Sequence, residues 1–149
     1  MTVSDVCTRA VVTATPGETI AEAAKRMRDM HVGTLVVVDG ERRNHPAGIL
    51  TDRDIVINAV AQSPDKVESL LIGDLMAREL ATARPTESLD SALTTMRSRG
   101  VRRLPVVSGD GFLEGLIALD DILEVMSEEL GDLVGLVARE QKLERELHR

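Results

Sequence analysis

The stretch Gly48-Ile49-Leu50-Thr51-Asp52-Arg53-Asp54-Ile55 decides the fold, because it returns as Gly115-Leu116-Ile117-Ala118-Leu119-Asp120-Asp121-Ile122. Each copy has a glycine, an apolar segment of strand length and a turn that leads directly into a helical pattern. A carboxylate, Asp54 or Asp121, occupies the third helical position of each copy. A helix start has unpaired N–H groups and partial positive charge, so it is a natural place to hold an anion or a hydroxyl-rich ligand.

The composition restricts the class of protein. The chain has 149 residues, of which 43% are hydrophobic and 29% are charged, as in globular proteins. A net charge of −7 and a single Phe, with no Trp or Tyr, argue against nucleic-acid binding. Cys7 is the only cysteine, which excludes an internal disulfide and fits a reducing compartment. No segment resembles a signal peptide or a membrane span, so we expect a cytoplasmic protein that does not bind membranes.

The whole chain reads as an internal repeat. Thr13-Ala14-Thr15-Pro16 matches Thr82-Ala83-Arg84-Pro85, and Leu35-Val36-Val37-Val38 matches Leu104-Pro105-Val106-Val107, both at an offset of 69 residues. The two glycine stretches are 67 residues apart, so the loop before the second one is two residues shorter. We therefore divide the chain into a first unit with its linker, residues 1–66, a second unit, residues 67–130, and a C-terminal helical extension, residues 131–149.

Each unit is predicted to have the element order β-α-β-β-α. In the first unit, residues 10–13 predict a strand, and Thr19 is expected to cap a helix that ends at residues 31–33. The apolar run 35–38 predicts a strand covered on both faces, followed by a strand at 47–50 and a helix at 52–61. The predicted fold class is therefore α/β in the broad sense (α+β), with two packed units and a long C-terminal helix.

The last helix does not stop with the second unit. Apolar residues continue at steps of four and three: Ile122, Met126, Leu130, Leu133 and Val137. An amphipathic helix of this length must cover its apolar stripe. It either packs back on its own unit or pairs with a helix of a second copy, and we favour the second arrangement.

These motifs together resemble a tandem pair of CBS (cystathionine β-synthase) domains. The resemblance rests on Asp74-Leu75-Met76, Thr82 with Pro85, Leu104-Pro105-Val106-Val107 and the two glycine stretches, and it covers roughly residues 3–130. It implies two units packed by pseudo-twofold symmetry, with two clefts that commonly bind AMP, ADP, ATP, S-adenosylmethionine or NAD. It also implies a sensor or regulator without a catalytic cofactor, often as a homodimer, that acts on an unidentified enzyme or transporter.

The resemblance also implies which residues bind the ligand. Asp54 and Asp121 would accept hydrogen bonds from the ribose hydroxyls, since a carboxylate is a strong acceptor. We expect the first cleft to combine Thr51 and Asp54 with residues 32–34, and the second to combine Asp121 with residues 101–103. The turn of the other unit would close each cleft. The full set of expected ligand-binding residues is Thr51, Arg53, Asp54, Val12, Val32, Gly33, Thr34, Leu80, Ala81, Val101, Arg102, Arg103, Ala118, Asp120 and Asp121.

Other interpretations stay open at this point. Thr51 and Asp54 fit a capping box, so their role could be to cap a helix and nothing more. Ala118 has no hydroxyl, which predicts two unequal clefts and leaves open a dimerisation or docking scaffold with degenerate clefts. Arg102 and Arg103 would bind phosphate or else form a solvated helix end. His31, His45 and His148 show no metal-ligand spacing, and no motif supports an enzyme. The sequence names neither the ligand, the partner nor the direction of a switch.

Overall fold

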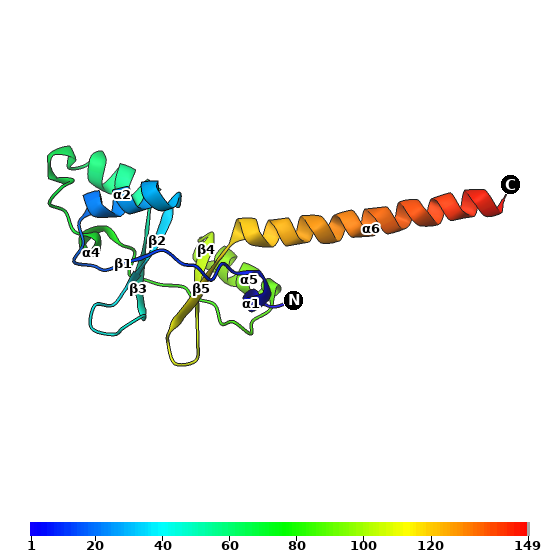
Figure 1. Ribbon diagram of the computed structural model, residues 1–149, viewed down its shortest axis with the longest axis horizontal. Coiled ribbons are helices and arrows are strands. Elements are labelled where there is room, and N and C mark those ends of the chain that lie inside the picture. The colour runs from blue at the N-terminus through cyan, green and yellow to red at the C-terminus, as the bar shows by residue number, and fades with distance from the viewer. Residues whose placement is uncertain (149) are drawn as a thin grey trace.

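The computed structural model describes residues 1–148 as two α+β units from which one long helix extends (Figure 1). The strands are β1 (Thr13–Ala14), β2 (Thr34–Val38), β3 (Pro46–Thr51), β4 (Arg103–Val107) and β5 (Leu113–Ala118). In the first unit β1 runs parallel to β2, and β2 runs antiparallel to β3. In the second unit β4 and β5 form an antiparallel pair, and the counterpart of β1 is reduced to a single parallel bridge between Ala83 and Val106.

The helices are α1 (Val3–Val6), α2 (Ile20–Met30), α3 (Asp52–Asp54), η1 (Ile55–Val60), η2 (Pro64–Lys66), α4 (Ile72–Leu75), α5 (Leu89–Arg99) and α6 (Leu119–Leu147). The two helices predicted for each unit are present, and α1, η2 and α4 are additional short helices that the sequence did not predict. α3 continues directly into the π-helical η1, so together they form the helix expected at residues 52–61. The predicted cap of α2 is confirmed, because the Thr19 hydroxyl accepts the N–H of Glu22 at 3.1 Å.

The first predicted strand is wrong in its bounds. We expected it at residues 10–13, whereas β1 contains Thr13 and Ala14 alone. The reason lies in the tertiary structure: the chain just before residue 10 bonds to the other unit. Thr8 and Leu116 exchange both backbone hydrogen bonds at 2.9 Å, so the chain joins β2 only from the carbonyl oxygen of Val12, which accepts the N–H of Val36 at 3.1 Å. The first strand predicted for the second unit is also wrong, since only the bridge at Ala83 forms there. The other predicted strands are confirmed, and Leu35, Val36 and Val37 are fully buried in β2, as expected for a strand covered on both faces.

Each unit completes its hydrophobic core with a short helix from the other half of the sequence. Val3 of α1 packs with Leu104 and Ile117 in the second unit. Its repeat counterpart, Ile72 of α4, packs with Leu35 in the first unit. The division at residue 66 follows the repeat and stays a prediction, whereas the packing assigns α1 to the second core and α4 to the first. This exchange ties the two units together through buried side chains.

The two glycines of the repeated stretches are required by this exchange. A Cβ atom on Gly48 would lie 2.7 Å from the carbonyl oxygen of Ala77, and one on Gly115 would lie 2.8 Å from that of Thr8. Both distances are too short for any side chain. Glycine is therefore needed where the exchanged segment crosses the face of each edge strand.

Helix α6 leaves the body of the protein soon after it begins (Figure 1). It contacts β5, α1 and α5, and Ile122 is its one buried residue within the described part of the chain. The less favoured alternative, that it packs back on its own unit, is therefore wrong beyond its first turns. Among residues 1–148, no helix combines the length and apolarity needed to cross a membrane.

Candidate functional site

The first of two clefts, cleft A, lies where the end of β3 and the start of α3 meet the second unit. It has a volume of 370 Å³, within the usual range of about 300–1,000 Å³ for small-molecule sites. Its lining residues are Ile49, Thr51, Arg53, Asp54, Ala77, Glu79, Leu80, Ala81, Gly100, Val101, Arg102 and Arg103. Residues from both units therefore form one concave surface.

The second cleft, cleft B, is the counterpart of cleft A under the repeat. It is smaller, at 220 Å³, and its lining residues are Thr8, Ala10, Val11, Val12, Val32, Gly33, Thr34, Arg103, Leu116, Ala118 and Asp121. The matching is close: Thr8 corresponds to Ala77 and Val12 to Ala81 at the 69-residue offset, and Asp121 corresponds to Asp54 at 67. The two clefts are thus the same place in the fold, built twice.

The pairing expected from the sequence is wrong. We expected Thr51 and Asp54 to face residues 32–34 of their own unit, but they face Val101 and the two arginines of the second unit. Likewise Asp121 faces residues 32–34 and not residues 101–103. The exchanged segments cause this difference, because they bring the edge strand of each unit beside the first segment of the other.

Asp120 lies at the rim between the clefts. It shares a small hollow with Arg102, Arg103, Ala118 and Leu119, and its Oδ1 is 3.5 Å from Nη2 of Arg102. Both side chains are more than two-thirds exposed, so this ion pair is weak. A stronger anion can therefore replace Asp120 as the partner of Arg102. Every other residue of the expected set lines cleft A or cleft B.

The helix-start carboxylates cap their helices in both units. The N–H of Thr51 donates to Oδ2 of Asp54 at 2.9 Å, and the N–H of Asp54 donates to the Thr51 hydroxyl at 3.1 Å. Asp121 makes the equivalent bond with the N–H of Ala118 at 3.0 Å, without a hydroxyl in return. Within residues 1–148, Oδ1 of each aspartate has no hydrogen-bond partner. Capping therefore occupies one oxygen and leaves the other available to a ligand.

Thr34 is a polar residue of cleft B with an unused hydroxyl. It is 7% exposed, and its Oγ1 has no hydrogen-bond partner among the described residues. Leaving a buried polar atom unpaired costs about 1–3 kcal/mol, so a ligand or water in cleft B is its natural partner. The matched position in cleft A is Arg103.

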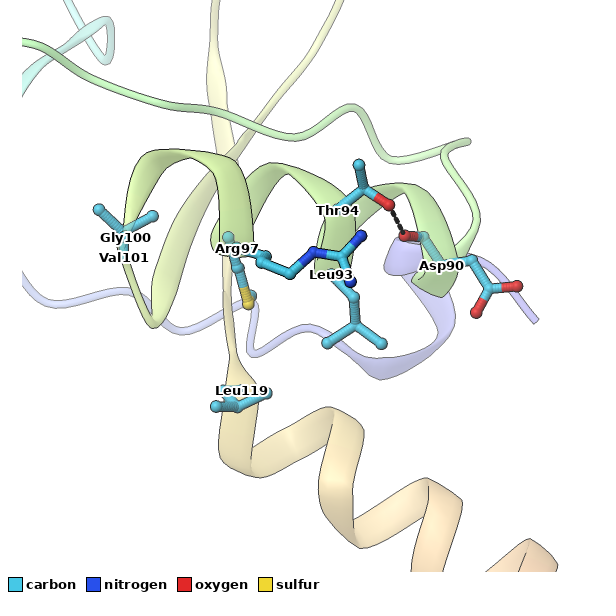
Figure 2. A pocket seen from close by; sticks show the side chains of 8 residues that line it. Asp90, Leu93, Thr94, Arg97, Gly100, Val101 and Leu119 are labelled. Carbon is cyan, nitrogen blue, oxygen red and sulfur yellow. Dashed lines mark hydrogen bonds between the residues drawn. The ribbon is translucent and has the colours of Figure 1, made fainter.

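A further hollow, larger than cleft A or cleft B, is lined by neither helix-start aspartate. Figure 2 shows side chains that line it. This groove, which we call the α5 groove, has a volume of 680 Å³ and lies along α5 and the first residue of α6. Its lining residues are Asp90, Leu93, Thr94, Met96, Arg97, Gly100, Val101 and Leu119. Thr94 is occupied in bonding the Asp90 carbonyl oxygen of its own helix. We therefore look for the small-molecule sites in clefts A and B.

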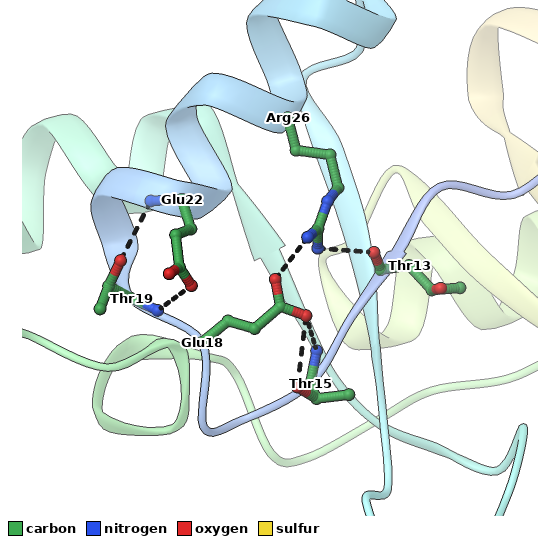
Figure 3. A network of polar contacts seen from close by, with 6 residues as sticks. All are labelled: Thr13, Thr15, Glu18, Thr19, Glu22 and Arg26. Atoms are coloured by element: carbon green, nitrogen blue, oxygen red, sulfur yellow. Dashed lines mark hydrogen bonds and ion pairs between the residues drawn. The ribbon is translucent and has the colours of Figure 1, made fainter.

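A polar network holds β1 in the first unit, next to cleft B (Figure 3). The Arg26 guanidinium forms an ion pair with Glu18 and donates to the Thr13 carbonyl oxygen at 3.0 Å. Glu18 also accepts the N–H of Thr15 at 3.1 Å. Partial burial opposes ionisation of Glu18, but these hydrogen bonds and the charge of Arg26 lower its pKa overall. The network fastens α2 to the short strand that follows Val12.

Sequence reasoning missed part of both linings. Val11 could have been found, because it lies 69 residues before Leu80, which was in the expected set. Thr8 and Ala77 could not have been found, since they reach the clefts through backbone pairing with the other unit.

Among residues 1–148, no cluster of three or more His, Cys, Asp or Glu is arranged to hold a metal ion. Cys7 is partly buried against the second core, and this burial raises the pKa of its thiol.

The paired architecture and its two clefts agree with the comparisons with known proteins. The family model described as the CBS domain matches residues 3–60 and again residues 72–128. The chain belongs to the CBS domain family. The resemblance noted from the sequence is therefore confirmed, and the two-unit fold with it.

Named relatives and solved structures support this assignment. The CBS domain-containing protein YhcV of Bacillus subtilis is 37% identical over 128 residues, which cover 85% of this chain and 87% of YhcV. Protein MK0525 of Methanopyrus kandleri is 36% identical over 127 residues, and this chain spans 62% of its length and 84% of its own. The CBS domain pair of protein MJ0100, solved with 5-methylthioadenosine and S-adenosyl-L-methionine, has a TM-score of 0.76 at 26% identity. The aligned region covers 87% of this chain and 98% of the MJ0100 chain.

Proposed function

We propose that this CBS pair is a regulatory module that binds an adenosine-containing ligand in cleft A and passes the signal to a partner enzyme or transporter. One observation carries the proposal: cleft A joins the unused carboxylate oxygen of Asp54 from one unit to Arg102 and Arg103 from the other. A hydroxyl-binding group and a phosphate-binding group thus face one concave space. A phosphorylated nucleoside has both matching parts.

Each part of such a ligand has a partner in cleft A. Asp54 would accept hydrogen bonds from the ribose hydroxyls, and these bonds are strengthened by its charge. Arg102 and Arg103, with Arg53 beside them, would bind the phosphates through their forked donors. The base would lie against the aliphatic side chains of Leu80 and Val101.

Cleft B favours an adenosine ligand without phosphate. Ala118 replaces Thr51 and Gly33 replaces Arg102, so cleft B loses a hydroxyl and one arginine. It shares Arg103 with cleft A, and Thr34 stands at the position that matches Arg103. Asp121 and the Thr34 hydroxyl remain to bind the ribose. The ligands of the MJ0100 domain pair support this distinction, because neither methylthioadenosine nor S-adenosylmethionine carries a phosphate.

Ligand binding would regulate by linking the two units. Both clefts are formed by residues of both units, so a bound ligand favours the relative orientation that brings its two sides together. The partner would respond to that orientation. The shift can be no larger than the difference in ligand affinity between the orientations.

Isothermal titration tests the proposal. Protein shown by mass spectrometry to be free of co-purified ligand is titrated with AMP, ADP, ATP, NAD, S-adenosylmethionine and methylthioadenosine. We expect two sites, with phosphorylated ligands lost in Asp54→Asn and unphosphorylated ligands lost in Asp121→Asn. Each variant is the control for the other, and asparagine keeps an oxygen for the helix cap. If no ligand of the panel binds the stripped protein, the sensor proposal fails.

A second candidate function rests on Ala118. A cleft without its helix-start hydroxyl could be vestigial, and the protein would then be a dimerisation or docking scaffold. Titration of the protein partner with and without nucleotide separates the two functions, because a scaffold binds that partner equally well in both cases.

A further inference from the structure

Helix α6 exposes more apolar surface than an isolated helix in water supports. Within the described chain, Ile122 is its one buried residue, whereas nine large apolar side chains are 40–83% exposed. They are Leu123, Met126, Leu130, Leu133, Val134, Leu136, Val137, Leu143 and Leu147. Most of the stability of a helix in a protein comes from packing of its apolar face. This face therefore needs a partner.

We propose that α6 pairs with α6 of a second copy in antiparallel orientation, with the twofold axis beside Val134 and Gly135. In this register Met126 lies opposite Leu143 of the second copy, and Leu133 lies opposite its Leu136. The apolar stripe of the first half, which contains Met126 and Leu133, is replaced after Val137 by a neighbouring stripe that contains Leu136, Leu143 and Leu147. An antiparallel pair places these two stripes against each other.

The charges of α6 favour the same orientation. Its first half carries acidic residues and no basic one: Asp120, Asp121, Glu124, Glu128, Glu129 and Asp132. The basic residues Arg139, Lys142 and Arg145 all lie in the second half, where Glu140, Glu144 and Glu146 balance them. About the same twofold axis, Glu124 lies opposite Arg145 of the second copy and Glu128 lies near its Lys142, whereas Glu129 lies beside both Arg139 and Glu140. A parallel pair would instead place the acidic halves side by side, where like charges repel.

The α5 groove provides a place for the far end of the second helix (Figure 2). Leu93, Met96 and Leu119 form its apolar side, next to the start of α6. In the antiparallel register, Leu143 and Leu147 of the second copy arrive beside the first turns of α6, which is the end nearest this groove. The interface therefore continues from the helix pair onto the second unit.

This proposal is independent of what the clefts bind, since no residue of α6 beyond Asp121 lines cleft A or cleft B. Light scattering after size exclusion tests the dimer. We expect twice the chain mass of 16.2 kDa, and Leu133→Asp should give the monomer with an unchanged thermal transition of the body. Ala138→Asp, which places the same charge on α6 away from the stripe, should stay dimeric. A monomeric wild-type protein at micromolar concentration overturns the proposal.

Disulfide trapping tests the orientation in a Cys7→Ser background. Val134→Cys, beside the axis, should cross-link with itself. Met126→Cys and Leu143→Cys should each fail to cross-link alone and should cross-link when mixed. Self-cross-linking of Met126→Cys would show a parallel pair and overturn the register.

Charge reversal tests the ion pair between the two helices. Arg145→Glu should weaken the dimer about tenfold, and adding Glu124→Arg should restore it; no restoration contradicts the charge pairing.

Discussion

Cleft A and cleft B share one backbone arrangement, and four of the matched positions at which they differ change a charge or a hydroxyl near the helix starts. The pairs, with the residue of cleft A first, are Thr51 and Ala118, Arg53 and Asp120, Arg102 and Gly33, and Arg103 and Thr34. In each of these four pairs the residue of cleft A has the more positive charge or the additional hydroxyl, although Arg103 also lines cleft B. Two other matched pairs differ in the opposite sense, because Glu79 of cleft A matches Ala10 and Ala77 matches Thr8. The helix-start carboxylate is kept in both. The comparison teaches that the fold requires the aspartate and the glycine of each repeat, whereas the flanking positions are free to set ligand chemistry.

The two units differ in a second way that follows from single residues. In the first unit Arg26 clamps Glu18 and Thr13, and β1 forms a short strand. At the matched position the second unit has Thr95, whose hydroxyl bonds the Ser91 carbonyl oxygen of its own helix. Without the arginine, the counterpart of β1 is the single bridge at Ala83. Local fastening thus decides how much of this edge strand forms.

The largest expected effect comes from breaking the feature that both units share. Gly115→Val places side-chain atoms against the Thr8 carbonyl oxygen and should destabilise the protein by about 3 kcal/mol or more. Urea unfolding measures the change. Gly109→Ala is the control, because a Cβ there meets no atom within 4 Å. Equal stability of the two variants would contradict the close crossing of the exchanged segment.

Exchanging the differing side chains should convert one cleft into the other. Arg102→Gly gives cleft A the matched residue of cleft B and should weaken binding of phosphorylated adenosine ligands by about 10- to 100-fold, through loss of charge-assisted bonds. Arg103 is kept, because it lines both clefts. Binding of an unphosphorylated ligand to cleft B should change less. Titration with ATP and with methylthioadenosine measures both. Equal losses for the two ligands would argue against the assignment of charge to cleft A.

The clamp of the first unit should contribute less, about 1 kcal/mol, and in a pH-dependent way. The pKa of Glu18 is lowered in the folded protein from its usual 4.5, so its contribution is present above that value and is lost as the pH falls through the folded value. Arg26→Ala should lower the melting temperature at pH 7 and have little effect near pH 3. Thr95→Ala, at the matched position, should show no such pH dependence. A loss from Arg26→Ala that is the same at both pH values would exclude the ion pair as its cause.

The smallest effect is expected at Thr34. Thr34→Val removes a hydroxyl that has no partner within the described chain, so the unliganded protein should change in stability by less than about 0.5 kcal/mol or gain slightly. Binding to cleft B should weaken, because the ligand loses this hydrogen bond. Denaturation and titration of the same sample measure both quantities. A clear loss of stability without ligand would mean that the hydroxyl is paired inside the protein.

Much of this architecture was readable from local patterns. The repeat, the element order, the cap at Thr19, the buried strand at residues 35–38 and the carboxylate at each helix start all depend on neighbours within a few positions. Spacing of 2, 3 or 4 residues determines which side chains share a face of a strand or helix. For that reason the sequence by itself determined two similar units, each with an aspartate at the same turn.

The tertiary structure decided which halves meet. Thr8 lies more than a hundred residues from Leu116, and no local period relates them, yet their pairing sends α1 into the second core and gives each cleft its second wall. The same crossing explains Gly48 and Gly115 and leaves the Thr34 hydroxyl facing cleft B. Contacts between distant segments depend on how complete surfaces pack against each other. The order of residues along the chain does not show this packing directly. The sequence indicates which residues surround the clefts. The exchange of the two short helices determines which of these residues face each other.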